Sequence, residues 1–279
     1  EELPSEGVET VTFRFFMETN MRKNILAEKL RSGQVVLGLC NMYPAAGIIE
    51  GMCPGWDFVW IDGQHGEMAY ADCLHAVQVA QGVGLGTLLR VPGHEPAFLG
   101  TYADICPSAI MVPMVDTPEQ AKAVAQALRF PPLGNRSYGG RRVIDLGGRD
   151  YFREQELLVF AQIETLEAVK NLKGILATEG IDGVFFGPDD MKVRMGIPIN
   201  TPITDNDQLR RGLEETARAA AEAGKIAAGV APSAPAIKMM TGMGYRLFAC
   251  GGDILFLRTM SAQRLAELRE AVGAKAEGT

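Results

Sequence analysis

The 279-residue sequence has no run of about 18 apolar residues, the length that a membrane-spanning helix requires, and therefore predicts no membrane span. It also has no basic tract. Its 27 Lys and Arg against 34 Asp and Glu give a net charge of −7, which disfavours nucleic acid and anionic membranes as partners. The five cysteines are odd in number and never spaced C-x-x-C. This argues against disulfides or a zinc finger and indicates a cytoplasmic protein.

Histidine is scarce, which limits the metal sites that the chain can build. Only His65, His75 and His94 occur, and His75 falls within a predicted helix. A site made of carboxylates is therefore a more economical expectation than a three-histidine site. The sequence has no G-x-S-x-G or Walker motif, and no lysine ends an apolar run, which argues against a Schiff-base aldolase.

Short apolar runs alternate with helical patterns along the chain, and this order indicates the fold. Near-continuous apolar runs are typical of parallel strands buried on both faces. The predicted strands are 35–39, 58–62, 87–91, 109–115, 158–164, 183–187, 225–231 and 246–251. The predicted helices between and after them are 46–52, 70–82, 96–105, 117–129, 165–178, 207–224, 234–244 and 261–275.

Eight strands alternating with eight helices predict a (β/α)₈ TIM barrel. A doubly wound open sheet is the competing fold, but it usually carries a phosphate loop after its first strand, where this chain has CNMYPAA. The longest connection, 131–156, is predicted to be a loop. Residues 1–20 match nothing downstream and are expected to be an N-terminal extension or a cloning remnant, so that 21–279 form one barrel domain.

Polar side chains gather where the predicted strands end, which in a barrel is the catalytic face. They are Asp62, His65, Arg90, Gln162, Glu164, Asp189 and Asp190. Gln162 and Glu164 are two residues apart and so point to the same side of their strand. A buried carboxylate needs a partner. Glu164 could therefore form a salt bridge with Arg90, or it could share a divalent ion such as Mg²⁺, Mn²⁺ or Co²⁺ with Asp190. His65 could be a general base or a structural residue, and His94 competes with it for the first role.

Six segments taken together resemble the HpcH/HpaI family of metal-dependent class II pyruvate aldolases. They are WIDGQHG (60–66), LLRVPG (88–93), IMVPMVDTPEQA (110–121), FPPLGNRSYGG (130–140), AQIET (161–165) and FFGPDDM (185–191). The resemblance runs in order through about residues 24–272. It implies a TIM barrel of the phosphoenolpyruvate/pyruvate type, whose last helix is exchanged with a neighbouring subunit within a homohexamer.

The resemblance also implies a role for each matching residue. Glu164 and Asp190 match the metal ligands, and His65 matches the catalytic histidine. Arg90 matches the arginine that steadies the substrate keto oxygen. The remaining matches are the acid that raises the basicity of the histidine (Asp104), a supporting acid (Asp62) and the substrate contacts (Gln162 and the backbone at Asp189).

The activity implied is reversible cleavage of 4-hydroxy-2-oxo acids to pyruvate and an aldehyde, through a metal-stabilised pyruvate enolate. Oxaloacetate decarboxylation would pass through the same enolate. The alternatives are an oxaloacetate decarboxylase, an acyl-CoA lyase of the same superfamily and, more remotely, a barrel that only binds. Three departures from the family pattern bear on the site. Gln64 replaces the usual acid before the histidine, and Asp189 adds an acid beside a metal ligand. After Asp104, Cys106-Pro107 stands where the family more often has a glycine.

Overall fold

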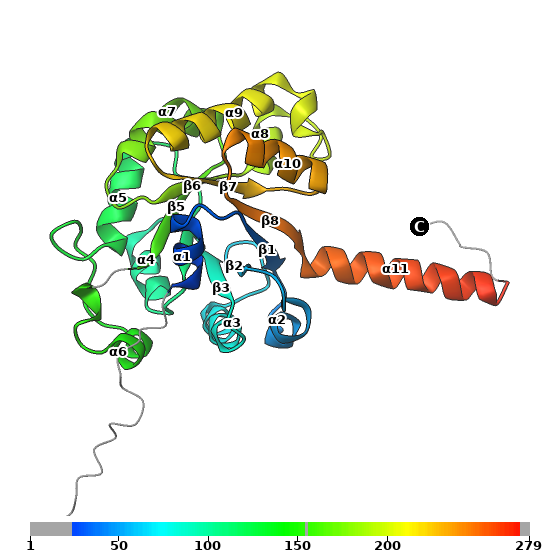
Figure 1. The fold of residues 1–279 in the computed structure, drawn as a ribbon, viewed down its shortest axis with the longest axis horizontal. Coiled ribbons are helices and arrows are strands. Elements are labelled where there is room, and N and C mark those ends of the chain that lie inside the picture. The colour runs from blue at the N-terminus through cyan, green and yellow to red at the C-terminus, as the bar shows by residue number, and fades with distance from the viewer. Residues whose placement is uncertain (1–23, 154–155, 274–279) are drawn as a thin grey trace, which may run out of the picture.

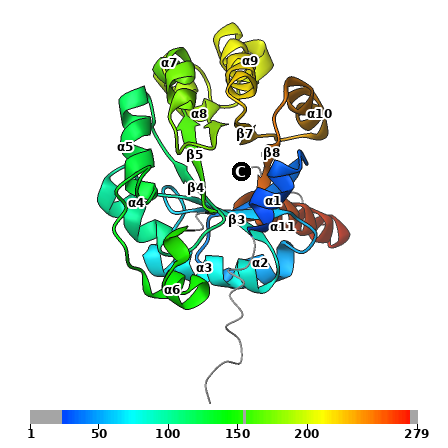
Figure 2. The ribbon, with the colours of Figure 1, turned by 60° about the vertical axis from the view of Figure 1, so that its left-hand side comes forward.

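The computed structural model describes residues 24–153 and 156–273 and shows a closed barrel. Eight parallel strands pair in chain order, and β8 pairs with β1 (Figures 1 and 2). The strands are β1 (Val36–Asn41), β2 (Phe58–Asp62), β3 (Gly86–Arg90), β4 (Ala109–Val112), β5 (Leu158–Ile163), β6 (Gly183–Phe186), β7 (Ile226–Val230) and β8 (Leu247–Gly252). The predicted (β/α)₈ barrel is confirmed. The segment 1–20 lies outside the described residues.

The strands are apolar throughout because both of their faces are buried. Alternate side chains point into the barrel, where Phe58, Trp60, Leu88, Phe160 and Phe185 belong to one packed cluster. The intervening side chains pack outward against the ring of helices that Figure 2 shows around the strands. The interior is thus filled with side chains. Polar groups enter it only where the strands end.

The helices between the strands follow the predicted order, with three differences. The structure has α1 (Ile25–Arg31), α2 (Ala46–Met52), α3 (Tyr70–Gly82), α4 (Pro96–Ala103), α5 (Pro118–Leu128), α6 (Arg141–Gly147), α7 (Leu166–Ala177), α8 (Pro188–Met195), α9 (Asp207–Glu222), α10 (Ala234–Met243) and α11 (Asp253–Ala271), with short 3₁₀ turns at Tyr151–Arg153 and Ile203–Asp205.

Sequence reasoning missed α6 and α8 and began the last helix eight residues too late. Both missed helices are only two turns long, too short to show a clear apolar period. The last helix begins directly after β8 because the buried Asp253 stands at its first position. The Asp253 carboxylate accepts hydrogen bonds from the side chain of Asn41 and the backbone of Met42 and Tyr43, at 2.9–3.0 Å.

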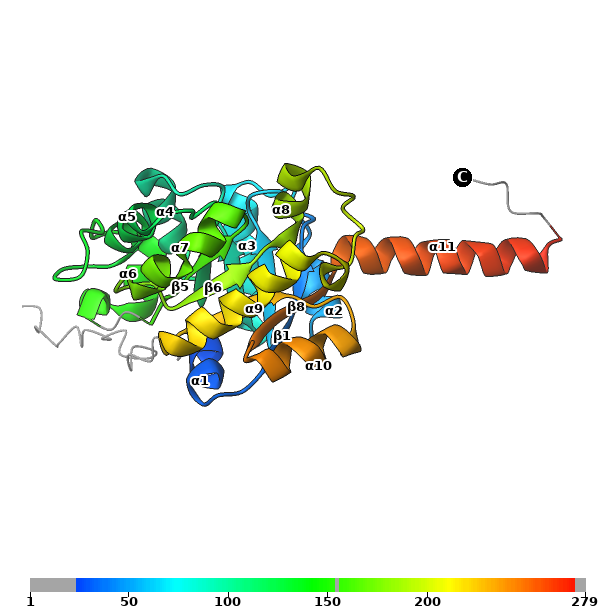
Figure 3. The same cartoon turned by 90° about the horizontal axis from the view of Figure 1, so that it is seen from above.

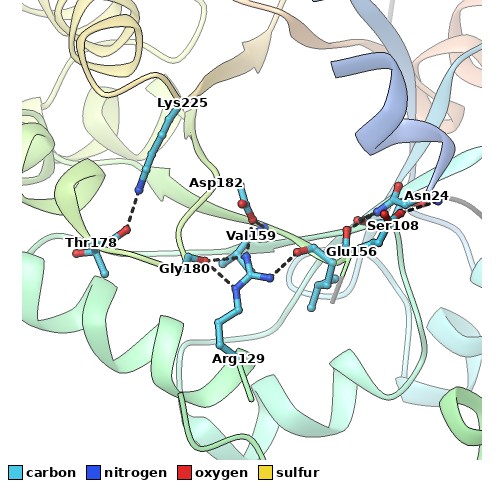
Figure 4. Close-up of polar contacts among 10 residues, drawn as sticks. Asn24, Ser108, Arg129, Glu156, Val159, Thr178, Gly180, Asp182 and Lys225 are labelled. Carbon is cyan, nitrogen blue, oxygen red and sulfur yellow. Dashed lines mark hydrogen bonds and ion pairs between the residues drawn. The ribbon is translucent and has the colours of Figure 1, made fainter. Parts of the chain in front are cut away.

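A network of charged side chains closes the amino ends of β5 and β6 (Figure 4). Arg129, 6% exposed, donates to the carbonyl oxygens of Leu157 and Gly180 and pairs with Asp182 at 2.5 Å. The same Asp182 carboxylate accepts the backbone N–H of Val159 at 2.7 Å. These contacts keep the buried charge of Arg129 paired and hydrogen-bonded. This end of the barrel therefore contributes to stability.

The first turn of the last helix, α11, packs on the barrel through Asp253 and Phe256, and the rest of the helix projects away from it (Figures 1 and 3). Of its residues only Asp253 is buried. Large apolar side chains along it are about half exposed or more: Leu255, Met260, Leu265, Leu268 and, just beyond its end, Val272. Within the described ranges no helix combines the length and the apolar character that crossing a membrane would take.

Candidate active site at the carboxyl ends of the strands

A buried ion pair joins β2 and β3 at the barrel mouth. Arg90 Nε and Nη2 donate to the two carboxylate oxygens of Asp62 at 2.8 and 2.6 Å. Arg90 and Asp62 are 7% and 1% exposed. The guanidinium also lies over the ring of Trp60, 4.9 Å from its centroid. These contacts fix the arginine in one position. They also show that Arg90 pairs with Asp62, and not with Glu164 as the salt-bridge alternative required.

His65 is carried on the turn that follows β2, and Asp62 shapes that turn. Asp62 Oδ1 accepts the backbone N–H groups of Gln64 and His65, each at 3.2 Å. A Cβ at Gly66 would lie 2.3 Å from the carbonyl oxygen of Asp62, so the turn can close only around glycine. The imidazole of His65 is exposed. A single carboxylate therefore places both the arginine and the histidine-bearing turn.

Glu164 lies just past the end of β5 and is 2% exposed. Burial raises its pKa to about 7, an effect that the charge of Asp190 adds to, while the Met114 backbone amide and Arg90 oppose it. The Met114 N–H donates to Glu164 Oε2 at 3.0 Å. The proximity of Asp190 and Arg90 to this carboxyl shows that the three groups share one region of the mouth.

The backbone of Met114 is in the left-handed region, with φ +57°. This conformation turns its N–H toward Glu164, and it is uncommon for a residue that has a side chain. This contact could not be predicted from the sequence, because every residue except proline has a backbone N–H and the residue type does not show which one donates. Residues 113–115, which follow β4, continue its apolar pattern and were therefore predicted as part of the strand.

We expect Met114→Val to lower the free energy of unfolding by about 1–2 kcal/mol, because a β-branched side chain is disfavoured in the left-handed region. Met114→Gly keeps the same amide and accepts that backbone, so it should stay within about 1 kcal/mol of wild type. Urea unfolding of the two variants measures the difference. Equal stabilities would show that the left-handed backbone is not under strain.

Gln162 and Gly187 complete the surroundings of Glu164. Gln162 is 3% exposed, and its Oε1 is buried without a hydrogen-bond partner. A Cβ at Gly187 would lie 3.0 Å from Gln162 Nε2 and 3.1 Å from Glu164 Cγ, so glycine keeps this space open. Two carboxylates and an unpartnered amide oxygen form a donor set that suits a hard divalent ion. Among the described residues no group of three or more His, Cys, Asp and Glu forms a metal cluster, so this set depends on Glu164, Asp190 and neutral oxygens.

Asp189 and Asp190 lie in the first turn of α8 but differ in their surroundings. The side chain of Asp189 is 69% exposed and accepts a hydrogen bond from Lys192 Nζ at 3.1 Å. That ammonium group also donates to the carbonyl oxygen of Ile199 at 2.8 Å. Asp189, the acid that this sequence has in addition to the family pattern, therefore pairs with Lys192. Asp190 is half-buried and is the member of the pair that acts electrostatically on Glu164.

Asp104 lies apart from these residues. It caps the C-terminal end of α4, the helix that runs from the carboxyl end of β3 back toward the start of β4. Its carboxylate pairs with Arg136 Nη2 at 2.6 Å, and Gly140 packs against it. Among the described residues no hydrogen bond or ion pair joins Asp104 to His65. One chain therefore brings Asp62, His65, Arg90, Gln162, Glu164 and Asp190 to the mouth, but leaves Asp104 on the α4 side.

Comparison with known proteins is consistent with this arrangement. Residues 46–254 match the family model described as HpcH/HpaI aldolase/citrate lyase. The chain belongs to this family. It is therefore an enzyme of a carbon–carbon lyase family, and the mouth just described is where the chemistry of a barrel enzyme takes place.

Relatives of known name and structure cover nearly the whole barrel. The chain is 32% identical to 2-keto-3-deoxy-L-rhamnonate aldolase of Escherichia coli K12 over 250 residues, which is 87% of this chain and 92% of the relative. Its structure is similar to that of an HpcH/HpaI aldolase from Desulfitobacterium hafniense, with TM-score 0.80, 28% identity and coverage of 88% and 97%. A family protein from Burkholderia cenocepacia gives TM-score 0.79 at 26% identity, with coverage of 88% and 99%.

Proposed function

We propose that this protein is a divalent-metal-dependent aldolase that cleaves or forms 4-hydroxy-2-oxo acids, with pyruvate and an aldehyde as the other partners. The observation that carries the proposal is the buried Glu164 carboxylate, which lies near enough to Asp190 and Arg90 for their charges to act on its pKa. An unpaired buried carboxylate is costly, and a divalent cation is the partner that this set of oxygens suits. The E. coli relative, named for a 2-keto-3-deoxy sugar acid, supports a 2-oxo acid as substrate.

Glu164 and Asp190 would hold the ion, and Mg²⁺, Mn²⁺ and Co²⁺ all fit oxygen ligands of this kind. A bound divalent ion would act as a Lewis acid on the oxygens of an oxo acid. Gln162 Oε1 is a buried acceptor at the same place and is available to a substrate or a ligated water. The backbone at Asp189, in the first turn of α8, adds N–H groups suited to a carboxylate.

Arg90 would bind the keto oxygen of the substrate. Asp62 takes one N–H from each of Nε and Nη2, so Nη1 and the second N–H of Nη2 remain as donors for a substrate oxygen. Because Arg90 is buried and held by Asp62, its charge would stabilise the negative charge that develops on that oxygen. His65 would move a proton at the substrate methyl carbon or the aldol hydroxyl. Asp104 could support His65 only where another copy of the chain supplies it, since within one chain it pairs with Arg136.

The proposal is tested by ¹H NMR of pyruvate in D₂O. Metal-stripped protein should leave the methyl signal unchanged, and Mg²⁺, Mn²⁺ or Co²⁺ should cause its loss as the protons exchange. Glu164→Gln should abolish this exchange. The matched control is Glu167→Gln, an exposed carboxylate three residues along the same segment, which should exchange at the wild-type rate.

Absence of exchange with every metal, in folded protein, would overturn the pyruvate proposal. Oxaloacetate and acyl-CoA thioesters would then be assayed with the same variants. Release of CO₂ from oxaloacetate without pyruvate exchange would identify a decarboxylase.

We also propose that α11 packs against a neighbouring subunit, in an exchange of last helices within a hexamer. A 19-residue helix with apolar side chains exposed on it cannot bury them against its own barrel, from which it projects. The exposed Leu265 and Leu268, each just over half exposed, belong to the surface that a partner would cover.

Leu265→Asp combined with Leu268→Asp is expected to break the assembly into smaller species, because two carboxylates would be buried in an apolar contact. Sedimentation velocity at fixed protein concentration measures the loss. Gln263→Asp, on an exposed position of the same helix, serves as the control and should sediment as wild type does. An unchanged sedimentation coefficient for the double variant would show that α11 makes no subunit contact there.

A further inference from the structure

Asp253, the first residue of α11, carries a buried carboxylate that the proposed chemistry does not use. It is 0% exposed, and within the described part of the chain it forms no ion pair. Its Oδ2 accepts hydrogen bonds from Asn41 Nδ2 at 2.9 Å and from the backbone N–H groups of Met42 and Tyr43 at 3.0 Å each. Its Oδ1 accepts the backbone N–H of Ile254 at 2.8 Å. N–H donors therefore hold this charge between α11 and the connection that follows β1.

The connection that follows β1 lies against the turn that carries His65. The carbonyl oxygen of Met42 accepts the backbone N–H of Glu67 at 2.8 Å. The Met42 backbone also packs on Gly66, where a Cβ would lie 3.0 Å from the Met42 carbonyl oxygen and 3.3 Å from its Cα. Asp62 thus supports the beginning of the turn, and Met42 supports its end.

We propose that Asp253 is a positioning residue for His65 and acts through the backbone of Met42. The carboxylate fixes residues 41–43, the Met42 carbonyl oxygen fixes the end of the turn, and the turn sets the position of the imidazole. Because the same carboxylate begins α11 (Figures 1 and 3), the position of that helix and the position of the histidine turn are coupled. A catalytic role for His65 rests on the proposed function, whereas the coupling rests on these hydrogen bonds alone.

The test is hydrogen–deuterium exchange of the full-length, metal-free protein, measured by mass spectrometry on peptides that cover residues 63–68. Asp253→Asn keeps the size of the side chain but removes the charge that strengthens its hydrogen bonds. We expect the turn to exchange at least about tenfold faster in this variant, because the Glu67 N–H opens more often once Met42 is less firmly held. Peptides that cover β5 and β6 should exchange as in wild type. Unchanged exchange of the turn, or equally faster exchange throughout the barrel, would overturn the positioning role.

Two control variants separate positioning from stability and from assembly. Asp57 also accepts a backbone N–H, that of Leu37 at 2.9 Å, but it lies just before β2, at the amino ends of the strands. Asp57→Asn should therefore leave exchange of the turn unchanged. Leu265→Asp combined with Leu268→Asp keeps Asp253 and should also leave it unchanged, whether or not the subunits assemble. Faster exchange in this double variant but not in Asp253→Asn would show that assembly, and not Asp253, orders the turn.

A milder variant is available at the other side of the same contact. Asn41→Ala removes one donor and leaves the carboxylate in place, so we expect a smaller increase in exchange that is again confined to residues 63–68. This variant decides the question if Asp253→Asn does not fold. An unchanged turn in Asn41→Ala would then overturn the proposal.

The pyruvate assay tests whether the position of the turn matters for catalysis. Asp253→Asn should lower the rate of methyl-proton exchange at saturating pyruvate at least about tenfold per folded molecule, because misplacing a catalytic group is costly. KM should stay within about twofold of wild type, since Arg90 and Glu164 belong to other strands. A wild-type rate in spite of a loosened turn would overturn this catalytic consequence. Absence of methyl exchange in the wild-type protein would refute the proposed function and leave the hydrogen–deuterium result standing.

Discussion

Arg90→Lys is expected to slow the metal-dependent exchange of pyruvate methyl protons by about 10²–10³-fold, the cost of losing one well-placed charge-stabilising donor. Lysine retains the positive charge but has no planar fork. It cannot hold both oxygens of Asp62 and at the same time present a further donor to the substrate. The ¹H NMR assay in D₂O measures the rate directly, at saturating metal.

Arg129→Lys is the matched control for this substitution. Arg129 is as buried as Arg90 and is likewise paired with an aspartate, but it lies at the amino ends of the strands (Figure 4). Its replacement should lower stability and leave the exchange rate per folded molecule unchanged. If both variants slowed exchange to the same extent, the effect of Arg90 would reflect folding and not catalysis.

The second large effect that we expect is a pH dependence of the stability of the metal-free protein. Glu164 has its pKa raised from 4.5 to about 7 in the folded state, so its protonated form is favoured by folding. The contribution of Glu164 to the free energy of unfolding is therefore fully present below pH 4.5 and is lost as the pH rises through 7. A shift of this size corresponds to about 3 kcal/mol at pH 8 relative to pH 4, because each pH unit is worth about 1.4 kcal/mol. A bound divalent ion should restore the loss.

Thermal unfolding at fixed protein concentration, with and without Mn²⁺, checks this expectation. Wild-type protein should gain more from the ion at pH 8 than at pH 5. Glu164→Gln should show neither the pH-dependent loss nor the gain, since its side chain does not titrate. An equal gain from Mn²⁺ in wild type and Glu164→Gln would mean that the ion binds elsewhere.

The barrel and most of its mouth could be predicted from sequence because both depend on short-range patterns. A parallel strand buried on both faces must be apolar, so each strand was recognisable, and polar residues such as Asp62 and Glu164 stood out where the apolar runs stopped. Helices α6 and α8 were missed because two turns do not establish a period. The early start of α11 was missed because it depends on Asp253 reaching Asn41, 212 residues away in the chain.

The amino-acid sequence by itself determined the strand order, the end of the barrel that carries the polar groups and the identity of those groups. Only the tertiary structure decided how they pair. Arg90 forms its ion pair with Asp62 and not with Glu164. The backbone N–H of Met114 donates to Glu164, and Asp104 pairs with Arg136. Such choices depend on which donors and acceptors meet in space, and residue spacing along separate strands does not specify that.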